Sequence, residues 1–468
     1  MSKTTWRKVD SKVALTKPSS AFAPEHVWSN ADMGKLWHVL QPVPQHEWTW
    51  GPGTFAAYWF SDLINAGSWS QVSAFVVLGL TWWQSVLAVF VGGLLLSIVI
   101  ALNGVIGARL HTPFAISSRA PFGYIGSRFP VVSRMIIAWF WFSVNSYQGG
   151  LGVKLMLNAI WPSFRNFKNH LPASSGTTSQ DMLCFFLFWL SPTAAWVQVA
   201  AVPLLWTTTS LLGAITSNMA LAIYGEVLFQ PFDIIDKWLI EPSSGGRAAA
   251  FFCSLAWALG NATTNLTANS ISAANDMAVL FPKYINLRRG QLFCVFVGCW
   301  AFCPWLVLAT ASNFLSFMAS YAVILAPIAA ILASDYFLVH RKKYDVVALY
   351  DPSSIYRYNK LGINWRAFIA LVCAAGPNLP GMAKSIEPSV DIGNLRWVFC
   401  LSILFGLTVA ASVHWALHTI FPDRRSLIEE QITAVDVLAG RVPCYAHLAD
   451  TSSQDGTSVD KEASVDKA

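Results

Sequence analysis

Polar side chains inside otherwise apolar runs are the residues of this chain best suited to chemistry. The richest run covers residues 248 to 274, where seven of ten consecutive positions carry a hydroxyl or amide group: Asn261, Thr263, Thr264, Asn265, Thr267, Asn269 and Ser270. So many polar groups favour a wet interior face, with hydrogen bonding between helices as the alternative. The hydroxyls of Thr263 and Thr264 offer hard oxygen ligands to a cation, and Asn269 is a candidate substrate ligand.

The pair Trp141 and Asn145 lies in a second apolar run, residues 131 to 160. Their four-residue spacing places the two side chains one turn apart on one face of a helix. An aromatic plane beside an amide suits a flat heterocycle, which stacks on the indole and hydrogen-bonds to the amide. Aromatic packing in a tryptophan-rich protein is the alternative explanation.

A third run, residues 54 to 80, contains Asp62, Asn65 and Gly67. A helix interrupted by glycine at membrane depth frees backbone carbonyls that can coordinate a cation. The same glycine could instead allow close packing against a neighbouring helix.

The elements that position these residues follow from composition. Of 468 residues, 54% are hydrophobic and only 12% are charged, against roughly 25% charged in soluble domains. The apolar runs reach the roughly 20 residues that a helix needs to cross a bilayer, and the alternating strands of a β-barrel are absent from the sequence. We therefore predict an all-α, polytopic membrane protein. The predicted spans are 54 to 80, 82 to 103, 131 to 160, 199 to 224, 248 to 274, 290 to 311, 313 to 338, 364 to 384 and 395 to 420.

Basic residues orient the chain. They cluster in three loops between spans: Arg109, Arg119, Arg128 and Arg134; Lys283, Arg288 and Arg289; and Arg341, Lys342 and Lys343. The positive-inside rule places these loops in the cytoplasm, and clusters spread in this way do not predict nucleic-acid binding. Residues 1–50 lack a secretory signal and 423–468 are too polar to fold, so we expect two cytoplasmic tails, the second disordered. The tails could bind trafficking or ubiquitination machinery.

Residues 182 to 224 do not fit this topology easily. The apolar stretch 182 to 190 is too short to span a bilayer and is followed by Ser191-Pro192-Thr193. Residues 182 to 224 must cross the membrane twice or not at all, and two crossings would leave almost no turn. We therefore regard the junction near 190–197 as anomalous.

Nothing in the sequence predicts an enzyme. His111, His340, His414 and His418 lie near span ends, without a set of nucleophile, base and orienting group. Cys299 and Cys303 share a helix face, but neither histidine nor an acidic residue joins them, so packing explains them better than metal binding. We expect no cofactor and no metal beyond a possible sodium site.

Several motifs make the chain resemble a known family. They are WSNADM at 28 to 33, YWFSD at 58 to 62, NGVIGAR at 103 to 109, ANSISAAND at 268 to 276, SDYFLVHR at 334 to 341 and GINWR at 362 to 366. With these motifs the chain resembles the nucleobase:cation symporter-1 (purine-cytosine permease) family, in its fungal uracil, allantoin and uridine permease branch. The resemblance covers residues 28 to about 422.

The resemblance implies a LeuT-type inverted-repeat fold, in which broken helices one and six meet at a central site. It implies that Trp141 stacks on the substrate while Asn145, Asn269 and Asn65 read its edge. Asn145 and Asn65 stand where the family can carry glutamine. The implied cation site comprises the backbone of Ser61 and Ile64, the helix-eight position Gly260, and the hydroxyls of Thr263 and Thr264. The transporter domain would be residues 51–422.

Against the family pattern, roughly 90 residues are missing near residue 190, which leaves about 10 of 12 helices. Three explanations are open: a true short transporter, an exon missing from the sequence, or a decayed relative. The expected function is cation-coupled symport of a nucleobase-like heterocycle such as uracil, allantoin or uridine across the plasma membrane. We expect H⁺ to be the coupling ion, with Na⁺ as the alternative. The alternative function is a truncated, non-transporting sensor or interaction protein, or an inactive chain.

Overall fold

The computed structural model describes residues 48, 51, 53–54, 58–59, 65–190, 205–240, 243–282, 284–387, 389–393 and 395–433. Two predicted cation ligands, Ser61 and Ile64, lie outside these residues, as do the junction at 191–197 and residues 434–468. The described part is helical, and its one β-type pairing is an isolated bridge between Asp345 and Ile432.

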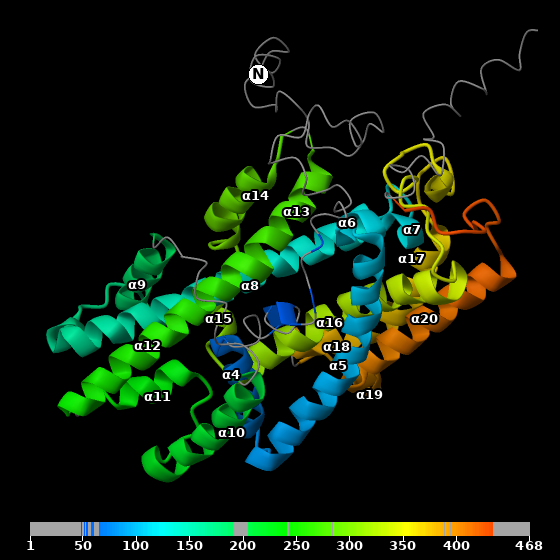
Figure 1. Ribbon diagram of the computed structural model, residues 1–468. Coiled ribbons are helices and arrows are strands. Elements are labelled where there is room, and N and C mark those ends of the chain that lie inside the picture. The colour runs from blue at the N-terminus through cyan, green and yellow to red at the C-terminus, as the bar shows by residue number, and fades with distance from the viewer. Residues whose placement is uncertain are drawn as a thin grey trace, which may run out of the picture.

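The first half of the described chain includes the cap residue Asn65 and the helix that bears Trp141 and Asn145. Its α-helices are α4 (Ala66–Val77), α5 (Trp82–Leu110), α6 (Phe114–Ser117), α7 (Arg119–Phe122), α8 (Arg128–Ile160), α9 (Ser179–Leu190), α10 (Leu205–Tyr224) and α11 (Pro231–Lys237), and η4 (Pro162–Asn166) and η5 (Ala173–Ser175) are short 3-10 turns. Helices α8 and α12 lie side by side in one part of the molecule (Figure 1).

The second half contains three π-helical turns. Its elements are α12 (Ser244–Thr264), η7 (Asn265–Ser270), α13 (Ile271–Leu280), α14 (Leu287–Phe293), η8 (Cys294–Gly298), α15 (Pro304–Val307), α16 (Ala311–Ser334), η9 (Asp335–Val339), η10 (Ile355–Arg357), α17 (Trp365–Ala375), η11 (Gly376–Asn378), α18 (Leu379–Ile386), α19 (Leu395–Cys400) and α20 (Ser402–Ile420). The turns η7, η8 and η9 are π-helical. Such turns occur frequently at functional sites, and η7 lies inside the polar run 261 to 270.

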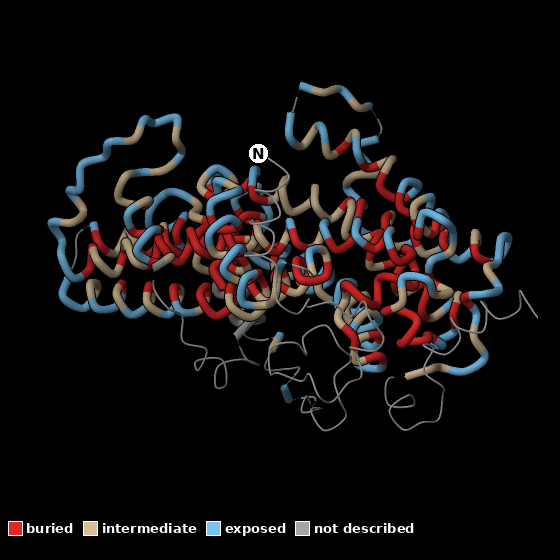
Figure 2. The backbone as a smooth tube through the Cα atoms, turned by 90° about the horizontal axis from the view of Figure 1, so that it is seen from above, coloured by how far each residue is buried: buried red, intermediate tan, exposed pale blue. Residues whose placement is uncertain are grey.

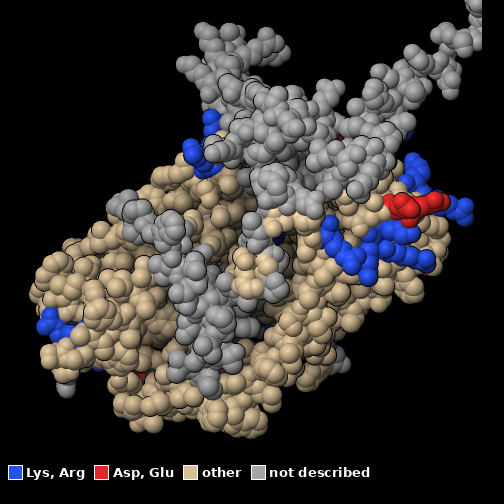
Figure 3. Space-filling model, in the orientation of Figure 1, with Lys and Arg blue, Asp and Glu red and all other residues tan. Residues whose placement is uncertain are grey.

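Three helices of the described chain are long and apolar enough to cross a membrane: Trp82–Leu110, Ala311–Val339 and Ser402–Ile420. Helix α5 is apolar around its whole circumference, and side chains such as Phe90 and Leu94 are exposed. A helix of this kind lies either in a large protein core or in a membrane, and the exposure of these side chains favours contact with lipid. On the face shown in Figure 3, lysine and arginine side chains form one group at the right, another near the top and a small one at the left edge.

The predicted span 290 to 311 is not a continuous helix. It consists of α14, the π-turn η8 and the short α15, and Cys303 between them has a left-handed backbone with φ 38°. Pro304 follows directly, and a proline disfavours helical backbone at the preceding residue. The chain therefore bends here, a feature that apolar run length alone does not reveal.

Glycines let the helices around the site approach closely. A Cβ on Gly150 of α8 would lie 2.6 Å from the Cα of Phe185 in α9, and one on Gly152 would lie 3.0 Å from the carbonyl oxygen of Ser254 in α12. Small residues at such crossings allow backbone-to-backbone packing between membrane helices. Buried residues lie along the inside of the bundle, while exposed ones follow its outer surface (Figure 2).

Candidate functional site

Helix α4 begins at Ala66, in the middle of the predicted span 54 to 80. Asn65 is its N-cap, with an extended backbone, and its Oδ1 accepts a hydrogen bond from Ser68 N at 2.9 Å. The N–H of Ala66 donates to Oδ1 of Asn261 in α12 at 3.4 Å. The start of α4 is thus fixed by its own cap and by the polar face of α12.

Gly67 brings α4 against α8 at the predicted substrate residues. A Cβ at this position would lie 2.9 Å from Asn65 Oδ1, 3.3 Å from Cζ3 of Trp141 and 3.8 Å from Oε1 of Gln148. The absence of a side chain at Gly67 therefore lets Asn65, Trp141 and Gln148 converge.

Helix α8 carries two buried amides on the face that meets α4. Asn145 is 1% exposed and Gln148 is fully buried. Among the described residues, neither Oδ1 of Asn145 nor either amide atom of Gln148 has a hydrogen-bond partner. Leaving a buried polar group unpaired costs about 1–3 kcal/mol, so these amides are suited to pair with a ligand.

The sequence analysis did not single out Gln148. It follows Asn145 by three residues, and a helix places residues at that spacing on the same face. This spacing was the one feature of the sequence that could have pointed to Gln148, because Gln148 lies in none of the family motifs.

The π-turn η7 is hydrogen-bonded to α8 through Asn265. Its Nδ2 donates to the carbonyl oxygen of Phe142 at 3.1 Å and to Oγ of Ser146 at 2.9 Å. Its Oδ1 in turn accepts a hydrogen bond from Nδ2 of Asn269 at 2.9 Å. Asn265 therefore positions the predicted substrate ligand Asn269.

The predicted cation ligands of α12 are adjacent. The hydroxyl of Thr263 donates to the carbonyl oxygen of Gly260 at 2.8 Å, and both Thr263 and Thr264 are buried. The hydroxyl oxygen of Thr263 and the carbonyl oxygen of Gly260 thus lie within one helical turn of each other. Their proposed partners Ser61 and Ile64 fall outside the described residues.

Trp141 borders this site with its indole partly buried. Its ring packs edge-on against Phe314 of α16, with centroids 6.3 Å apart and planes at 88°. Phe314 is itself fully buried, so the indole is held from the side that α16 occupies. Among the described residues its other ring contact is edge-on with the neighbouring Phe140, and neither contact is face-to-face stacking.

Comparison with known proteins identifies the family. The family of permeases for cytosine and purines, uracil, thiamine and allantoin matches residues 42–195 and 191–407. The chain belongs to this family. Together with its helical fold, this makes it an integral membrane permease, as the sequence predicted.

Curated relatives agree. An uncharacterized permease of Schizosaccharomyces pombe is 28% identical, over 84% of this chain and 85% of that protein. The allantoin permease of Saccharomyces cerevisiae is 29% identical, over 82% of this chain and 75% of its own length. The uracil permease of the same yeast is 27% identical, over 82% of this chain and 76% of its own length. All three are permeases.

Solved structures confirm the predicted transporter fold. Mhp1, a nucleobase-cation-symport-1 family transporter in a closed conformation with bromovinylhydantoin bound, matches with a TM-score of 0.53 and 20% identity. The match covers 80% of this chain and 93% of Mhp1. The inward-facing conformation of Mhp1 matches with a TM-score of 0.50.

The comparisons also bear on the junction near 190–197. The two family matches meet at residues 191–195. The alignment with the fission-yeast permease is 480 positions long, although it covers only 84% of a chain of 468 residues. That relative therefore has residues with no counterpart here.

Proposed function

We propose that this permease is a cation-coupled symporter of a nucleobase-like heterocycle such as uracil, allantoin or uridine, and that α4, α8 and η7 form its substrate site. The observation that carries the proposal is a pair of buried amides beside the indole of Trp141: among the described residues, Oδ1 of Asn145 and both amide atoms of Gln148 have no hydrogen-bond partner. A flat ring bearing carbonyl and N–H groups would satisfy these amides and stack on the indole.

The proposed roles follow from the contacts. Trp141 stacks on the ring, Asn145 and Gln148 bond to its edge, and Asn269 approaches from η7. The side-chain oxygen of Asn65 already caps α4, so Asn65 would reach substrate through its Nδ2. The names of two relatives, an allantoin permease and a uracil permease, support this substrate class.

Coupling would arise at the adjacent cation site. Gly260, Thr263 and Thr264 would supply oxygens from α12, and Ser61 and Ile64 would supply backbone carbonyls. Asn261 lies in the same helix, and its Oδ1 accepts a hydrogen bond from the first backbone N–H of α4. A cation that orders this part of α12 would therefore also order the start of α4. Ion and substrate together would then favour the occluded state more than either alone. We propose H⁺ as the ion, with Na⁺ as the alternative.

The proposed setting is the plasma membrane, with both termini cytoplasmic, a transporter domain over 51–422 and tails open to trafficking or ubiquitination machinery. The truncated, non-transporting alternative is favoured by one observation, the division of the family match at 191–195. Sequencing the expressed transcript across Leu190 to Val197 tests it. A longer message would remove the alternative, whereas a message that matches this chain would strengthen it.

Uptake measurements test the proposal itself. The full chain is expressed in cells that lack their own uptake of labelled uracil, allantoin and uridine, and its surface level is measured in parallel. We expect uptake of at least one of them, faster at low external pH and insensitive to Na⁺. Gln148→Leu should lower it about 10-fold or more, because the lost amide bonds are worth about 1–3 kcal/mol.

A matched control is Asn218→Leu in α10, whose amide nitrogen bonds only to a carbonyl of its own helix in the described chain. This variant should transport normally. Uptake unaffected by Gln148→Leu at equal surface level would contradict the proposed site.

A further inference from the structure

A charged cavity lies between α8 and α11, next to the proposed substrate site. Its volume is about 270 Å³, and Leu151 and Leu155 of α8 form part of its wall. Leu151 follows the proposed substrate ligand Gln148 by one helical turn, so the cavity continues along the same face of α8. Five of its lining residues are charged: Lys154, Glu226, Asp233, Asp236 and Lys237.

The cavity lies at the external end of the permease in the proposed topology. Helix α8 starts at Arg128, in a basic loop that this topology places in the cytoplasm, and therefore reaches the outside at Ile160. The run from α12 to α13 ends before the basic loop at 283 to 289, so α11, which precedes α12, is external. Helix α11 packs against α4, α8 and α12. A movement of α11 would therefore change the packing of the helices around both proposed sites.

The charged residues of the cavity are paired, with one exception. The ion pairs are Lys154 with Asp181, Asp236 with Arg165, and Lys237 with Glu226. In the first, Nζ of Lys154 lies 2.6 Å from Oδ1 of Asp181. The exception is Asp233, which takes part in no ion pair within the described part of the chain. An ionised Asp233 therefore adds an uncompensated negative charge to the cavity, and a proton removes that charge.

The neighbouring helices do not compensate Asp233 either. From α8, the hydroxyl of Tyr147 lies 3.4 Å from Oγ1 of Thr177. From α12, Arg247 donates to the carbonyl oxygens of Ala159 and Ile160, at the end of α8. Helix α4 has no titratable side chain. Burial raises the pKa of Asp233 to about 6, within the range that external pH can cover.

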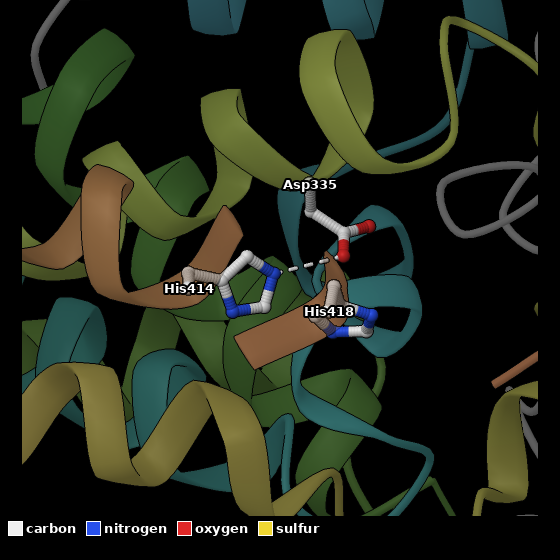
Figure 4. Close-up of side chains that lie close together, drawn as sticks. All are labelled: Asp335, His414 and His418. Atoms are coloured by element: carbon white, nitrogen blue, oxygen red, sulfur yellow. Dashed lines mark hydrogen bonds and ion pairs between the residues drawn. The ribbon is translucent and has the colours of Figure 1, made fainter. Parts of the chain in front are cut away.

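A second buried acid, Asp335, differs because both of its oxygens have partners. It opens the π-turn η9 where α16 meets α20, and with His340, His414 and His418 it forms the Asp335 cluster. Its Oδ1 lies 3.0 Å from Nε2 of His414, and its Oδ2 lies 3.0 Å from Nδ1 of His340. Figure 4 shows the carboxylate facing the His414 ring, with His418 beside them. A proton on Asp335 would have to displace one of these contacts, whereas one on Asp233 would not.

We infer that Asp233 is a proton-operated gate residue at the external end of this permease, and the inference rests on the proposed uptake from outside. When α11 closes on α8, an ionised carboxylate would lose its water without gaining a counter-charge, which is costly. A proton taken from the external water onto a carboxylate oxygen removes this cost and favours closure. It returns to the external water when the cavity reopens. Because closure at the outer end precedes delivery to the inside, acid outside accelerates uptake.

Thiol labelling of the full-length chain tests the gate without any substrate. Leu228→Cys places a thiol in the cavity, and a membrane-impermeant maleimide is added to intact cells at pH 7.5, with the unaltered chain as background. We expect this thiol to react about 10-fold more slowly when Asp233→Asn is also present, because the neutral amide favours closure. Loss of a nearby negative charge would by itself favour the reactive thiolate, so it would act in the opposite direction.

The matched control is Asp391→Asn, which neutralises an exposed acid outside the cavity. Combined with Leu228→Cys, it should leave the labelling rate unchanged. Equal surface levels of all variants are verified in parallel.

The pH profile of uptake is a second readout. Initial entry is measured between external pH 5 and pH 7 for whichever of labelled uracil, allantoin and uridine the unaltered chain takes up. Uptake by the unaltered chain should fall about 10-fold over this range, as the protonated fraction of a group with a pKa near 6 does. Asp233→Asn should keep its pH 5 rate at pH 7, which a merely misfolded variant would not do. Asp233→Glu retains a carboxyl group and should keep the fall.

Two results would overturn the inference. One is a labelling rate at position 228 that is the same with and without Asp233→Asn. The other is an Asp233→Asn variant with the pH profile of the unaltered chain. If Asp62→Asn then had the flat profile, the proton would be assigned to Asp62, which lies outside the described residues. A chain that takes up none of the three compounds would contradict the proposed function, and the labelling rates would still decide the role of Asp233.

Discussion

Asn269 donates a hydrogen bond from its Nδ2 to Oδ1 of Asn265 across one turn of the π-helix η7, with 2.9 Å between the two atoms. Asn265 uses its own Nδ2 to hold α8, so its carboxamide is fixed at both ends. The predicted substrate ligand is thus oriented by a neighbour that is anchored to the helix bearing Trp141 and Asn145.

Asn265→Ala should therefore weaken transport, although Asn265 itself is not a proposed substrate ligand. The change frees Asn269 to rotate and removes two bonds between η7 and α8. We expect the KM for uptake to rise about 10-fold, the equivalent of about 1.4 kcal/mol, with a smaller change in maximal rate. Concentration-dependent uptake at matched surface level measures both quantities. An unchanged KM would show that Asn269 needs no support from Asn265.

Sequence reasoning singled out part of the proposed site. Trp141, Asn145 and Asn269 stood out because aromatic and amide residues are conspicuous in apolar runs. The π-turn that presents Asn269 follows from hydrogen-bond geometry, which a run of polar residues does not specify. Gln148 went unnoticed because its importance depends on what surrounds it, namely Gly67 and the start of α4.

The Asp335 cluster shows a second limit. His414 and His418 were attributed to a span end, and their spacing on α20 was the one local signal. Their partners Asp335 and His340 come from residues more than 70 positions earlier, and only the packing of α16 against α20 brings them together. Long-range contacts of this kind leave no periodic pattern in the sequence.

Trp141 should tolerate another aromatic ring better than an aliphatic side chain. Stacking of a base on an aromatic ring is worth about 1–3 kcal/mol, so Trp141→Ala should lower uptake about 10- to 100-fold. Trp141→Phe should retain more uptake than Trp141→Ala. Trp83→Ala serves as control, since Trp83 is 53% exposed on the apolar helix α5. Equal losses in Trp141→Phe and Trp141→Ala would argue against stacking.

Asn145→Gln should change substrate preference. The variant supplies the longer amide that the family resemblance implies at this position, and it adds one methylene to a buried position. A difference of one methylene in a pocket is worth about 1–3 kcal/mol. We expect the uptake ratio of uracil to the larger uridine to rise about 10-fold, as measured by competition between labelled substrates. A constant ratio would place Asn145 outside the substrate pocket.

Asp233 should make stability depend on pH. It lines a cavity of about 270 Å³ together with Lys154, Glu226, Asp236 and Lys237. Burial raises the pKa of Asp233 from 3.8 to about 6. Because the folded state binds this proton more tightly, the associated stability is present below pH 3.8 and is lost as pH rises through about 6.

Asp233→Asn should therefore melt about 1–3 °C higher than the unaltered chain at pH 7.5, and at nearly the same temperature at pH 4.5. The exposed Asp391 supplies the control variant, Asp391→Asn, whose melting temperature should match that of the unaltered chain at both pH values. A difference that is the same at both pH values would mean that Asp233 does not carry the effect.

Gly150 of α8 should tolerate alanine poorly, because the Cβ of Gly150→Ala would meet the backbone of Phe185 at 2.6 Å. Overpacking of this kind costs about 1–3 kcal/mol, and here it pushes α9 from α8 just before the anomalous junction. Gly92→Ala in α5 is the matched change, since nothing lies within 4 Å of its Cβ. Alanine exceeds glycine in helix propensity by about 1 kcal/mol, so this variant should be neutral or stabilised.

Thermal unfolding in detergent measures both variants. The unfolding temperature of Gly150→Ala should lie below that of the unaltered chain, and that of Gly92→Ala should lie at or above it. The reverse order would mean that α9 does not pack against α8 as described.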